Sequence, residues 1–218
     1  MENGKNNYPA LYRNTLFPFF RRKVQSLTGT ENLPSQGPYI IVANHIGSID
    51  PPTIVSALHP FVQQTMYFVT EQYMVNILGL RRAITKLGMI PKIENKKSSC
   101  LEVAREYLEK GLIVGIFPEG MRNNGPILMR GKTGAARLAL WTKAPVIPVG
   151  YRGPGTWSVR QGMKNLFIKT DVPISINIGK PMHFANYYGT EITYERLRAV
   201  TSQIMRALAE LSGKLYPY

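Results

Sequence analysis

A histidine and an aspartate stand five residues apart in the segment Asn44-His45-Ile46-Gly47-Ser48-Ile49-Asp50, directly after the apolar run Tyr39–Ala43. A carboxylate that binds one nitrogen of an imidazole leaves the other nitrogen free to accept a proton. The glycine between them lets the chain fold back sharply enough for the two side chains to meet. The spacing therefore predicts a general base, His45, that is oriented by Asp50.

The same residues also allow a purely structural interpretation. Asp50 precedes Pro51-Pro52 and an apolar run that ends at Leu58, which is the pattern of a helix capped by a carboxylate and begun by proline. His45 would then be an ordinary buried histidine. The two interpretations are compatible, because a capping carboxylate can lend its second oxygen to the imidazole. Backbone N–H groups near the start of this helix are the oxyanion donors that we expect for catalysis.

Two further motifs also follow apolar runs. Phe117-Pro118-Glu119-Gly120 ends the run Ile113–Phe117, and three cations, Arg122, Arg130 and Lys132, come soon after it. Backbone donors beside a glycine, together with such cations, can bind a phosphate. Glu119 is expected to hold an arginine or to bond a substrate hydroxyl. Val146–Gly150, followed by Arg152, carries no chemistry of its own, and each motif alone is equally typical of a surface turn.

The pattern of apolar residues predicts an α/β fold. Five short runs rich in β-branched and aromatic residues read as buried strands, at 39–43, 66–69, 113–117, 146–149 and 174–178. Helices are expected at 99–110, at 132–142, and near the C-terminus, where apolar residues from Leu197 to Leu211 recur at helical spacing. We expect a single domain with a mixed, mostly parallel sheet sandwiched by helices.

The order of the three motifs, NHIGSID, FPEGMR and VIPVG, resembles the lysophosphatidate acyltransferase family, glycerolipid acyltransferases with an N-H-x-x-x-x-D motif. The stretch Gly131–Leu140 is similar to the helix that follows the Glu-Gly block of that family. The resemblance runs from about residue 33 to 181. It implies that a fatty acyl chain moves from a thioester to the free hydroxyl of lysophosphatidate, which gives phosphatidate in phospholipid synthesis.

The resemblance also implies roles for single residues. His45 corresponds to the catalytic base and Asp50 to its charge partner. The substrate-binding set that it implies is Asn44, Ser48, Glu119, Gly120, Arg122 and Lys132, of which Glu119, Gly120 and Arg122 belong to the block that binds the glycerol phosphate of the acceptor. No metal or cofactor is expected, and acyl-CoA or acyl-ACP (acyl carrier protein) is a co-substrate. Two departures, Met121 for the usual Thr and Glu94 for an Arg, affect the acceptor headgroup more than the reaction.

The composition indicates an anionic partner. Lys and Arg total 27 against 13 Asp and Glu, which gives a net charge of +14. The sequence has no recognisable nucleic-acid-binding motif, so an anionic membrane surface is favoured over nucleic acid. It has no run of about 20 apolar residues and no signal-peptide pattern. A single cysteine, Cys100, excludes an intrachain disulfide. We expect a peripheral or monotopic protein on the cytoplasmic face of the cell membrane.

The first 30 residues are expected to form an amphipathic, membrane-associating segment, with the acyltransferase domain in residues 31–218. Apolar and basic side chains are interleaved there, as in the run from Leu11 to Val24 that holds Arg13, Arg21, Arg22 and Lys23. This mixture suits the headgroup region of an anionic bilayer. The alternative is a helix that packs on the core and leaves its basic face in water, with Pro18 bending or interrupting it.

Other functions share these motifs. The acceptor can be another lysophospholipid or glycerol 3-phosphate, and a lipid hydrolase can use the same His and Asp with water. A covalent acyl-enzyme through Ser48 or Cys100 ranks below direct transfer, because Ser48 lacks a nucleophile-elbow sequence and Cys100 falls in the first turn of an expected helix. A basic nucleic-acid-binding protein is the non-enzyme alternative.

Overall fold

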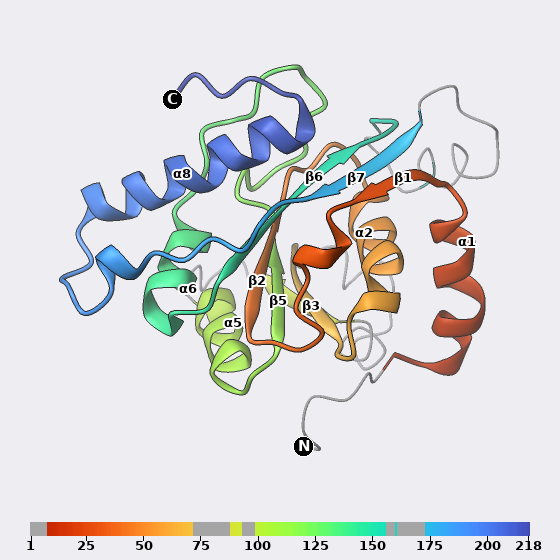
Figure 1. The fold of residues 1–218 in the computed structure, drawn as a ribbon, viewed down its shortest axis with the longest axis horizontal. Helices are drawn as coiled ribbons and strands as arrows, with labels where there is room; N and C mark the ends of the chain where they lie inside the picture. Colours follow the sequence, from red (N-terminus) through yellow and green to blue (C-terminus); the bar gives the residue numbers. More distant parts are fainter. Residues whose placement is uncertain (1–7, 72–87, 93–98, 156–159, 161–172) are drawn as a thin grey trace.

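Within the residues that the computed structural model describes (8–71, 88–92, 99–155, 160 and 173–218), seven strands form one sheet (Figure 1). The strands are β1 (Val24–Thr28), β2 (Tyr39–Ala43), β3 (Met66–Glu71), β4 (Met89–Lys92), β5 (Ile113–Ile116), β6 (Val146–Arg152) and β7 (Ile174–Ile178). Their order is β1-β7-β6-β2-β5-β3-β4, and every pair of neighbours is parallel except β6 and β7. The prediction of a mixed, mostly parallel sheet is confirmed, and all five predicted strands are present.

The two strands that the sequence pattern did not predict lie at the edges of the sheet. β1 occupies the last part of the expected N-terminal segment and pairs only with β7. β4 pairs only with β3 and contains Pro91, a residue that sheets tolerate mainly at their edges. An edge strand need not be apolar on both faces, so its composition differs little from that of a loop. Glu94, the departure noted above, lies outside the described residues.

Helices cover both faces of the sheet (Figure 1). α2 (Asp50–Leu58) packs on one face, and a π-helical turn, η1 (Tyr12–Leu16), continues into α1 (Phe17–Arg21) on its outer side. α5 (Ser99–Glu109), α6 (Gly134–Thr142) and α8 (Tyr194–Ser212) pack on the other face and confirm the three predicted helical segments. Short 3-10 turns are η2 (Thr30–Asn32), η3 (His59–Phe61) and η4 (Ala185–Tyr187). No described helix is long and apolar enough to cross a bilayer.

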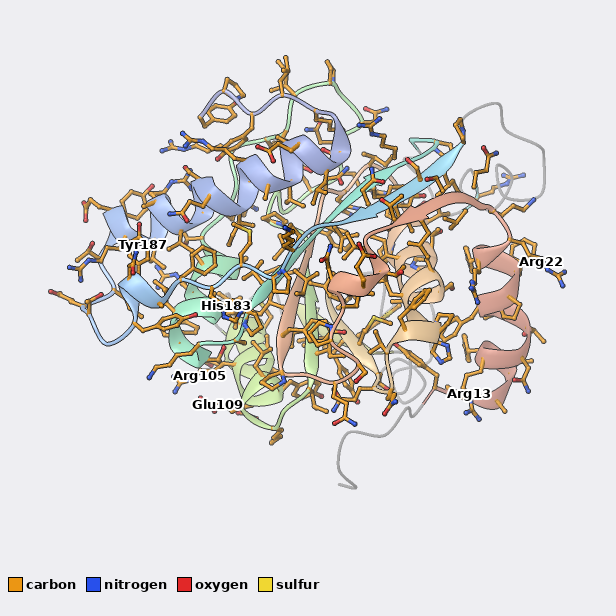
Figure 2. The ribbon with its side chains drawn as sticks, viewed as in Figure 1. Arg13, Arg22, Arg105, Glu109, His183 and Tyr187 are labelled. Atoms are coloured by element: carbon orange, nitrogen blue, oxygen red, sulfur yellow. The ribbon has the colours of Figure 1, made fainter. Side chains whose placement is uncertain are left out.

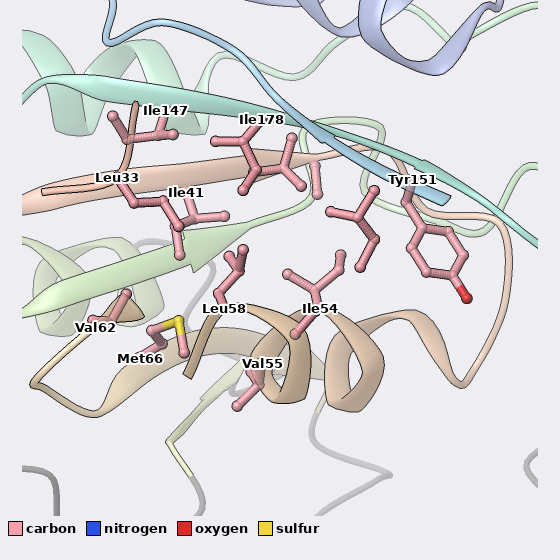
Figure 3. Close-up of a cluster of buried hydrophobic side chains, with 14 of the residues drawn as sticks. Leu33, Ile41, Ile54, Val55, Leu58, Val62, Met66, Ile147, Tyr151 and Ile178 are labelled. Carbon is pink, nitrogen blue, oxygen red and sulfur yellow. The ribbon is translucent and has the colours of Figure 1, made fainter. Parts of the chain in front are cut away.

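β2 lies at the centre of the core. Tyr39, Ile41 and Ala43 belong to the apolar cluster on the α2 side, which Figure 3 shows, and Ile40 and Val42 belong to the cluster formed with α5, α6 and α8. All five side chains are fully buried. Burial of one large aliphatic side chain contributes about 1.5–3 kcal/mol, so β2 is firmly held from both sides. The position of β2 therefore restrains the backbone of the residues that follow it, Asn44 and His45.

The topology brings the three sequence motifs to one edge of the sheet. β2 lies between β6 and β5, and both neighbours run parallel to it. Val42 pairs with Ile116, and Ala43 pairs with Val149. The carboxyl ends of all three strands therefore meet, which is where open α/β sheets bind their ligands.

Candidate active site

His45 and Asp50 form a hydrogen-bonded pair immediately after β2. His45 Nδ1 lies 3.0 Å from Asp50 Oδ2. The same oxygen accepts the backbone N–H groups of Ile46 at 2.6 Å and of Gly47 at 2.7 Å. A six-residue loop is thus closed around one carboxylate oxygen, and the predicted pair exists as a local structure.

Asp50 does not cap α2, which corrects the capping interpretation. It is the first residue of the helix, Ile49 occupies the cap position, and no side chain makes a capping hydrogen bond there. The two residues that follow, Pro51 and Pro52, have no N–H, and the Thr53 N–H donates to Ile49 O. The carboxylate instead binds residues that precede it in the loop, His45, Ile46 and Gly47. The Ile46 and Gly47 amides already bind this carboxylate, so an oxyanion donor near the start of α2 stays a prediction and would have to be another N–H group.

The His45 ring is partly exposed and keeps one nitrogen without a partner among the described residues. The side chain is 19% exposed, whereas that of Asp50 is fully buried. The ring stacks on Phe117, with centroids 4.3 Å apart and planes inclined by 23°. Within the described part of the chain, Nε2 has no hydrogen-bond partner. With Nδ1 bound to the carboxylate, Nε2 is placed to accept a proton from a substrate.

Burial dominates the electrostatics of Asp50. Desolvation raises the pKa of this carboxyl above its ordinary value, and the hydrogen bonds from His45, Gly47 and Ile46 act in the opposite direction. Its second oxygen, Oδ1, is buried without a hydrogen-bond partner in the described structure. A charge in such a medium is screened less than in water, so the carboxylate is a strong partner for the imidazolium that forms when His45 takes a proton.

Asn44 anchors the site and does not face the substrate. Its side chain is fully buried. Nδ2 donates to Tyr151 O at 2.9 Å, and Oδ1 accepts the Tyr151 N–H at 2.7 Å. The amide therefore extends the pairing of β2 with β6 by one step. The predicted contact of Asn44 with substrate is wrong, because the residue is fully buried and both polar atoms of its side chain bind Tyr151.

Glu119 belongs to the loop after β5 (residues 117–133, hereafter the β5 loop), where it binds protein donors. Only 1% of the residue is exposed. Oε1 accepts the His45 N–H at 3.2 Å, and Oε2 accepts Asn123 Nδ2 at 2.8 Å and the Met129 N–H at 3.0 Å. None of these donors is an arginine, which corrects that half of the expectation, while contact with a substrate hydroxyl stays a prediction. Glu119 holds the backbone of the base.

The remaining predicted residues lie around this core. Gly120 has φ +71°, and a side chain there would collide with Lys132, whose stem crosses it. Only glycine combines this backbone conformation with so close a neighbour. Arg122 is half-buried on the next turn of the β5 loop, and Ser48 is half-buried in the turn before α2. The structure brings Gly120 and Lys132 together, while phosphate binding by Arg122 and Lys132 stays a prediction.

Three positions were missed by the sequence interpretation. Phe117 stacks on the His45 ring, and the Asn123 N–H donates to His45 O at 2.6 Å. Lys214, beyond α8, donates to the carbonyl of Asn123 at 2.8 Å. The run Asn123-Asn124-Gly125 is a turn signal that could have drawn attention to the first of these asparagines. Lys214 has no such signal, because it is 91 residues away in sequence.

The site disfavours a covalent route through the only thiol. Cys100 is buried at the start of α5, in the apolar cluster on the opposite face of the sheet from α2. The sheet therefore separates this thiol from the face on which α2 packs. Direct attack by the acceptor hydroxyl fits this geometry better.

Comparison with known proteins agrees with this arrangement. The family model described as Acyltransferase matches residues 25–152, a range that contains all three motifs and Tyr151. The chain belongs to the acyltransferase family. The resemblance inferred from the motif order is confirmed, and the matched range includes His45, Asp50 and Glu119.

Individual relatives carry the same kind of name. The acyltransferase is 29% identical over 186 residues to the 1-acyl-sn-glycerol-3-phosphate acyltransferase of Bacillus subtilis, covering 85% of this chain and 86% of that one. It is 31% identical over 175 residues to a chloroplastic enzyme of that name from Brassica napus, covering 78% and 47%. The solved structure of the 1-acyl-sn-glycerophosphate acyltransferase from Thermotoga maritima has a TM-score of 0.64 at 23% identity and covers 93% and 80%, a likeness of fold.

Proposed function

We propose that this acyltransferase moves a fatty acyl chain from a thioester to the free hydroxyl of lysophosphatidate and so makes phosphatidate. The observation that carries the proposal is the His45–Asp50 pair, in which the carboxylate binds Nδ1 of an imidazole that is 19% exposed. The acceptor is the one named in the relatives from Bacillus subtilis and Brassica napus. Acyl-CoA and acyl-ACP remain alternative donors.

The reaction follows from the groups at the site. His45 Nε2 takes the proton of the acceptor hydroxyl while the hydroxyl oxygen attacks the thioester carbonyl. Asp50 stabilises the imidazolium that forms. When the tetrahedral intermediate collapses, the C–S bond breaks, and the imidazolium returns its proton to the departing thiolate. A positioned base of this kind contributes about 10²–10⁴-fold to the rate.

The acceptor and donor are identified by one product analysis. The purified protein is incubated with liposomes that hold lysophosphatidate, and with either acyl-CoA or acyl-ACP, and the lipids are identified by mass. Matched reactions contain glycerol 3-phosphate, lysophosphatidylcholine or no acceptor. We expect phosphatidate from lysophosphatidate. Free fatty acid formed equally with and without acceptor would show a hydrolase, and a preferred product from another acceptor would replace lysophosphatidate.

We also propose that the N-terminal segment places the site at an anionic membrane. α1 lies along α2: Phe20 packs with Ile49 beside the catalytic pair, and the Phe17 and His59 rings are 4.9 Å apart at the other end. Phe17 and Phe20 are buried, while Leu11 is 65% exposed. The segment thus turns its inner aromatic residues to the core and its basic and aliphatic residues outward.

Basic side chains line a groove on this side of the molecule. Its volume is about 630 Å³, and the groove runs between α1 and the end of α2. The cations that line it are Arg13, Arg21 and Arg22. Figure 2 shows Arg13 and Arg22 at the outer edge of α1, away from Arg105 on α5. Clustered arginines beside exposed aliphatic side chains suit lipid phosphates at the headgroup boundary.

Vesicle sedimentation tests the membrane proposal. Wild type should bind vesicles that contain phosphatidylglycerol more tightly than vesicles of phosphatidylcholine alone, and less tightly as salt is raised. Replacement of Arg13, Arg21 and Arg22 by Gln should weaken this binding. Arg105→Gln is the matched control, because Arg105 is an exposed arginine that pairs with Glu109 at 2.7 Å on another face. Equal binding of the triple variant and the control would contradict the proposal.

A further inference from the structure

The two residues after α8 and its C-cap glycine, Lys214 and Leu215, bind the β5 loop at four points. We refer to this pair as the C-terminal clasp. Lys214 Nζ donates to Asn123 O at 2.8 Å and to Gly125 O at 2.7 Å. Leu215 N donates to Pro126 O at 2.9 Å, and its carbonyl accepts the N–H of Leu128 at 2.8 Å. The clasp therefore fixes the backbone of the β5 loop on both sides of its exposed turn.

Asn123 connects the clasp to His45, because its backbone forms hydrogen bonds with both. Its carbonyl accepts Lys214 Nζ, and its N–H donates to His45 O. Its side-chain Nδ2 donates to Glu119 Oε2 at 2.8 Å and to Ile127 O at 2.7 Å, and its Oδ1 accepts the N–H of Gly125. Every polar atom of Asn123 is engaged. A displacement of its backbone must therefore move the hydrogen bond to His45.

Lys214 is also well placed by charge. It is half-buried, and within the described residues its ammonium bonds to carbonyl oxygens and forms no ion pair. Desolvation lowers its pKa, while the nearby carboxylates of Glu119 and Asp50 act to raise it. The cation thus lies in the field of the two buried carboxylates of the site. Hydrogen bonds from a cation are about twice as strong as neutral ones, so the clasp holds the β5 loop firmly.

We propose that Lys214 and Asn123 are positioning residues for catalysis: Lys214 fixes the β5 loop, and Asn123 transmits that position to the backbone of His45. The inference rests on the proposed function, because it assigns to these two residues the placement of the base. A general base must lie within hydrogen-bond reach of the proton that it removes, and a small misplacement lowers turnover without changing substrate affinity.

The decisive variant is Lys214→Met, which keeps the length of the side chain and removes the charge and both hydrogen bonds. We expect kcat to fall about tenfold, or about 1.4 kcal/mol at the barrier. KM for donor and acceptor should stay within about threefold. Lys214→Arg should restore most of the turnover, because it keeps the cation. Lys110→Met is the matched control, since the side chain of Lys110 is 54% exposed and its ammonium lies 3.6 Å from the carboxylate of Glu106 on the surface of α5.

Two measurements report on position without depending on the substrate. Amide hydrogen exchange at Asn123 and Leu128 should accelerate in Lys214→Met and stay unchanged in Lys110→Met. The rate at which diethyl pyrocarbonate modifies His45, mapped by mass, should change in the first variant only. Asn123→Ser keeps the backbone hydrogen bonds to Lys214 and His45 but removes the side-chain bonds to Glu119 and Ile127 that hold this backbone in place, so it replaces Lys214→Met if that variant fails to fold.

The outcomes separate the inference from the proposed function. If kcat of Lys214→Met equals that of Lys110→Met, the clasp does not position the base. A KM increase with unchanged kcat would make Lys214 a substrate contact instead. If the wild type transfers no acyl chain to lysophosphatidate, the proposed function fails, yet unchanged exchange and His45 modification in Lys214→Met would still overturn the inference on their own.

Discussion

The loop after β2 and the β5 loop meet at His45, but they are held by different kinds of contact. The first closes on itself: Asp50 binds His45, Ile46 and Gly47, all within five residues of it in sequence. The β5 loop depends on distant partners, because Glu119 is 74 residues from His45. Its cation from the clasp comes from a position 91 residues beyond Asn123.

This difference separates the chemistry of the site from its precision. The local loop supplies the base and its carboxylate, and it would form in outline wherever β2 ended. The β5 loop and the clasp decide where that base lies relative to a substrate. A site can thus carry the right groups on a short motif while its geometry depends on the whole fold. Substitutions in the two loops should therefore fail in different ways.

The largest effect is expected at the local loop. His45→Ala should lower kcat by about 10²–10⁴-fold, because it removes the proposed general base. The protein should stay folded, since the His45 backbone contacts to Glu119 and Asn123 do not need the ring. Turnover and thermal unfolding are measured together. His183→Ala is the control, because His183 is exposed and follows Met182, which pairs with Val146 at the end of β6 away from the pairing of Val149 with Ala43. Near-normal turnover of His45→Ala would exclude the proposed mechanism.

The same contrast explains how much of the fold could be predicted. Tyr39–Ala43 and Ile113–Ile116 are apolar on both faces, so the burial that forms these strands is visible in their composition. The edge strands Val24–Thr28 and Met89–Lys92 need one neighbour and one covered face, and they were missed. Pairing partners are not encoded in a strand's own residues, so the sheet order required the structure.

The site shows the same limit. His45 and Asp50 were predicted because five residues of chain suffice to bring them together. Asn44 and Glu119 were expected to touch substrate, but both are buried and bind backbone groups of distant segments. A polar residue beside a catalytic motif looks the same in sequence whether it faces ligand or protein. Lys214 could not be predicted at all, because its role exists only when α8 has folded against the sheet.

The second prediction tests whether Glu119 holds the base or the acceptor. Glu119→Gln places an amide NH₂ against either the His45 N–H or the donors of Asn123 and Met129, so one buried donor loses its acceptor. We expect kcat to fall about 10–100-fold and unfolding free energy to fall by about 1–3 kcal/mol. KM for lysophosphatidate should change little.

Glu109→Gln is the matched control, because Glu109 is half exposed and pairs only with Arg105 among the described residues. Its kinetics and stability should equal those of wild type. If Glu119→Gln raises KM for the acceptor and leaves kcat unchanged, Glu119 contacts the substrate instead. The proposed division, in which the loop after β2 supplies the reacting groups and the β5 loop positions them, would then be wrong.

The third prediction concerns Arg122, one of the three cations of the β5 loop. Arg122 lies on the turn after Gly120 and is half-buried. If it binds the acceptor phosphate, Arg122→Ala should raise KM for lysophosphatidate about tenfold, as expected for the loss of one charge-assisted hydrogen bond. KM for the acyl donor and kcat should change less. A rise in KM for the donor alone would assign Arg122 to the thioester's carrier instead, and Arg105→Ala on α5 serves as the control.

The smallest expected effect concerns Asp50, in the loop after β2, and the change in the protein's stability with pH. Burial raises the pKa of Asp50 in the folded protein above its unfolded value of about 3.9. The folded state therefore binds this proton more tightly, so the stabilisation is present at low pH and is lost as pH rises through the folded pKa. Asp50→Asn lacks this titration and can still accept the Ile46 and Gly47 amides. Wild type should thus lose stability relative to Asp50→Asn as pH increases from about 4.

Thermal unfolding of both proteins across pH 4 to 8 measures this difference, because the titrating groups that do not contact Asp50 are shared by both proteins and cancel. If wild type instead gains stability relative to Asp50→Asn as pH rises, the hydrogen bonds from His45, Ile46 and Gly47 lower the pKa of Asp50 by more than burial raises it. The carboxylate would then be held ionised by its own loop. In that case the local loop would stabilise its charge without help, and the cation of the clasp would act on the position of His45 alone and not on the charge of its partner.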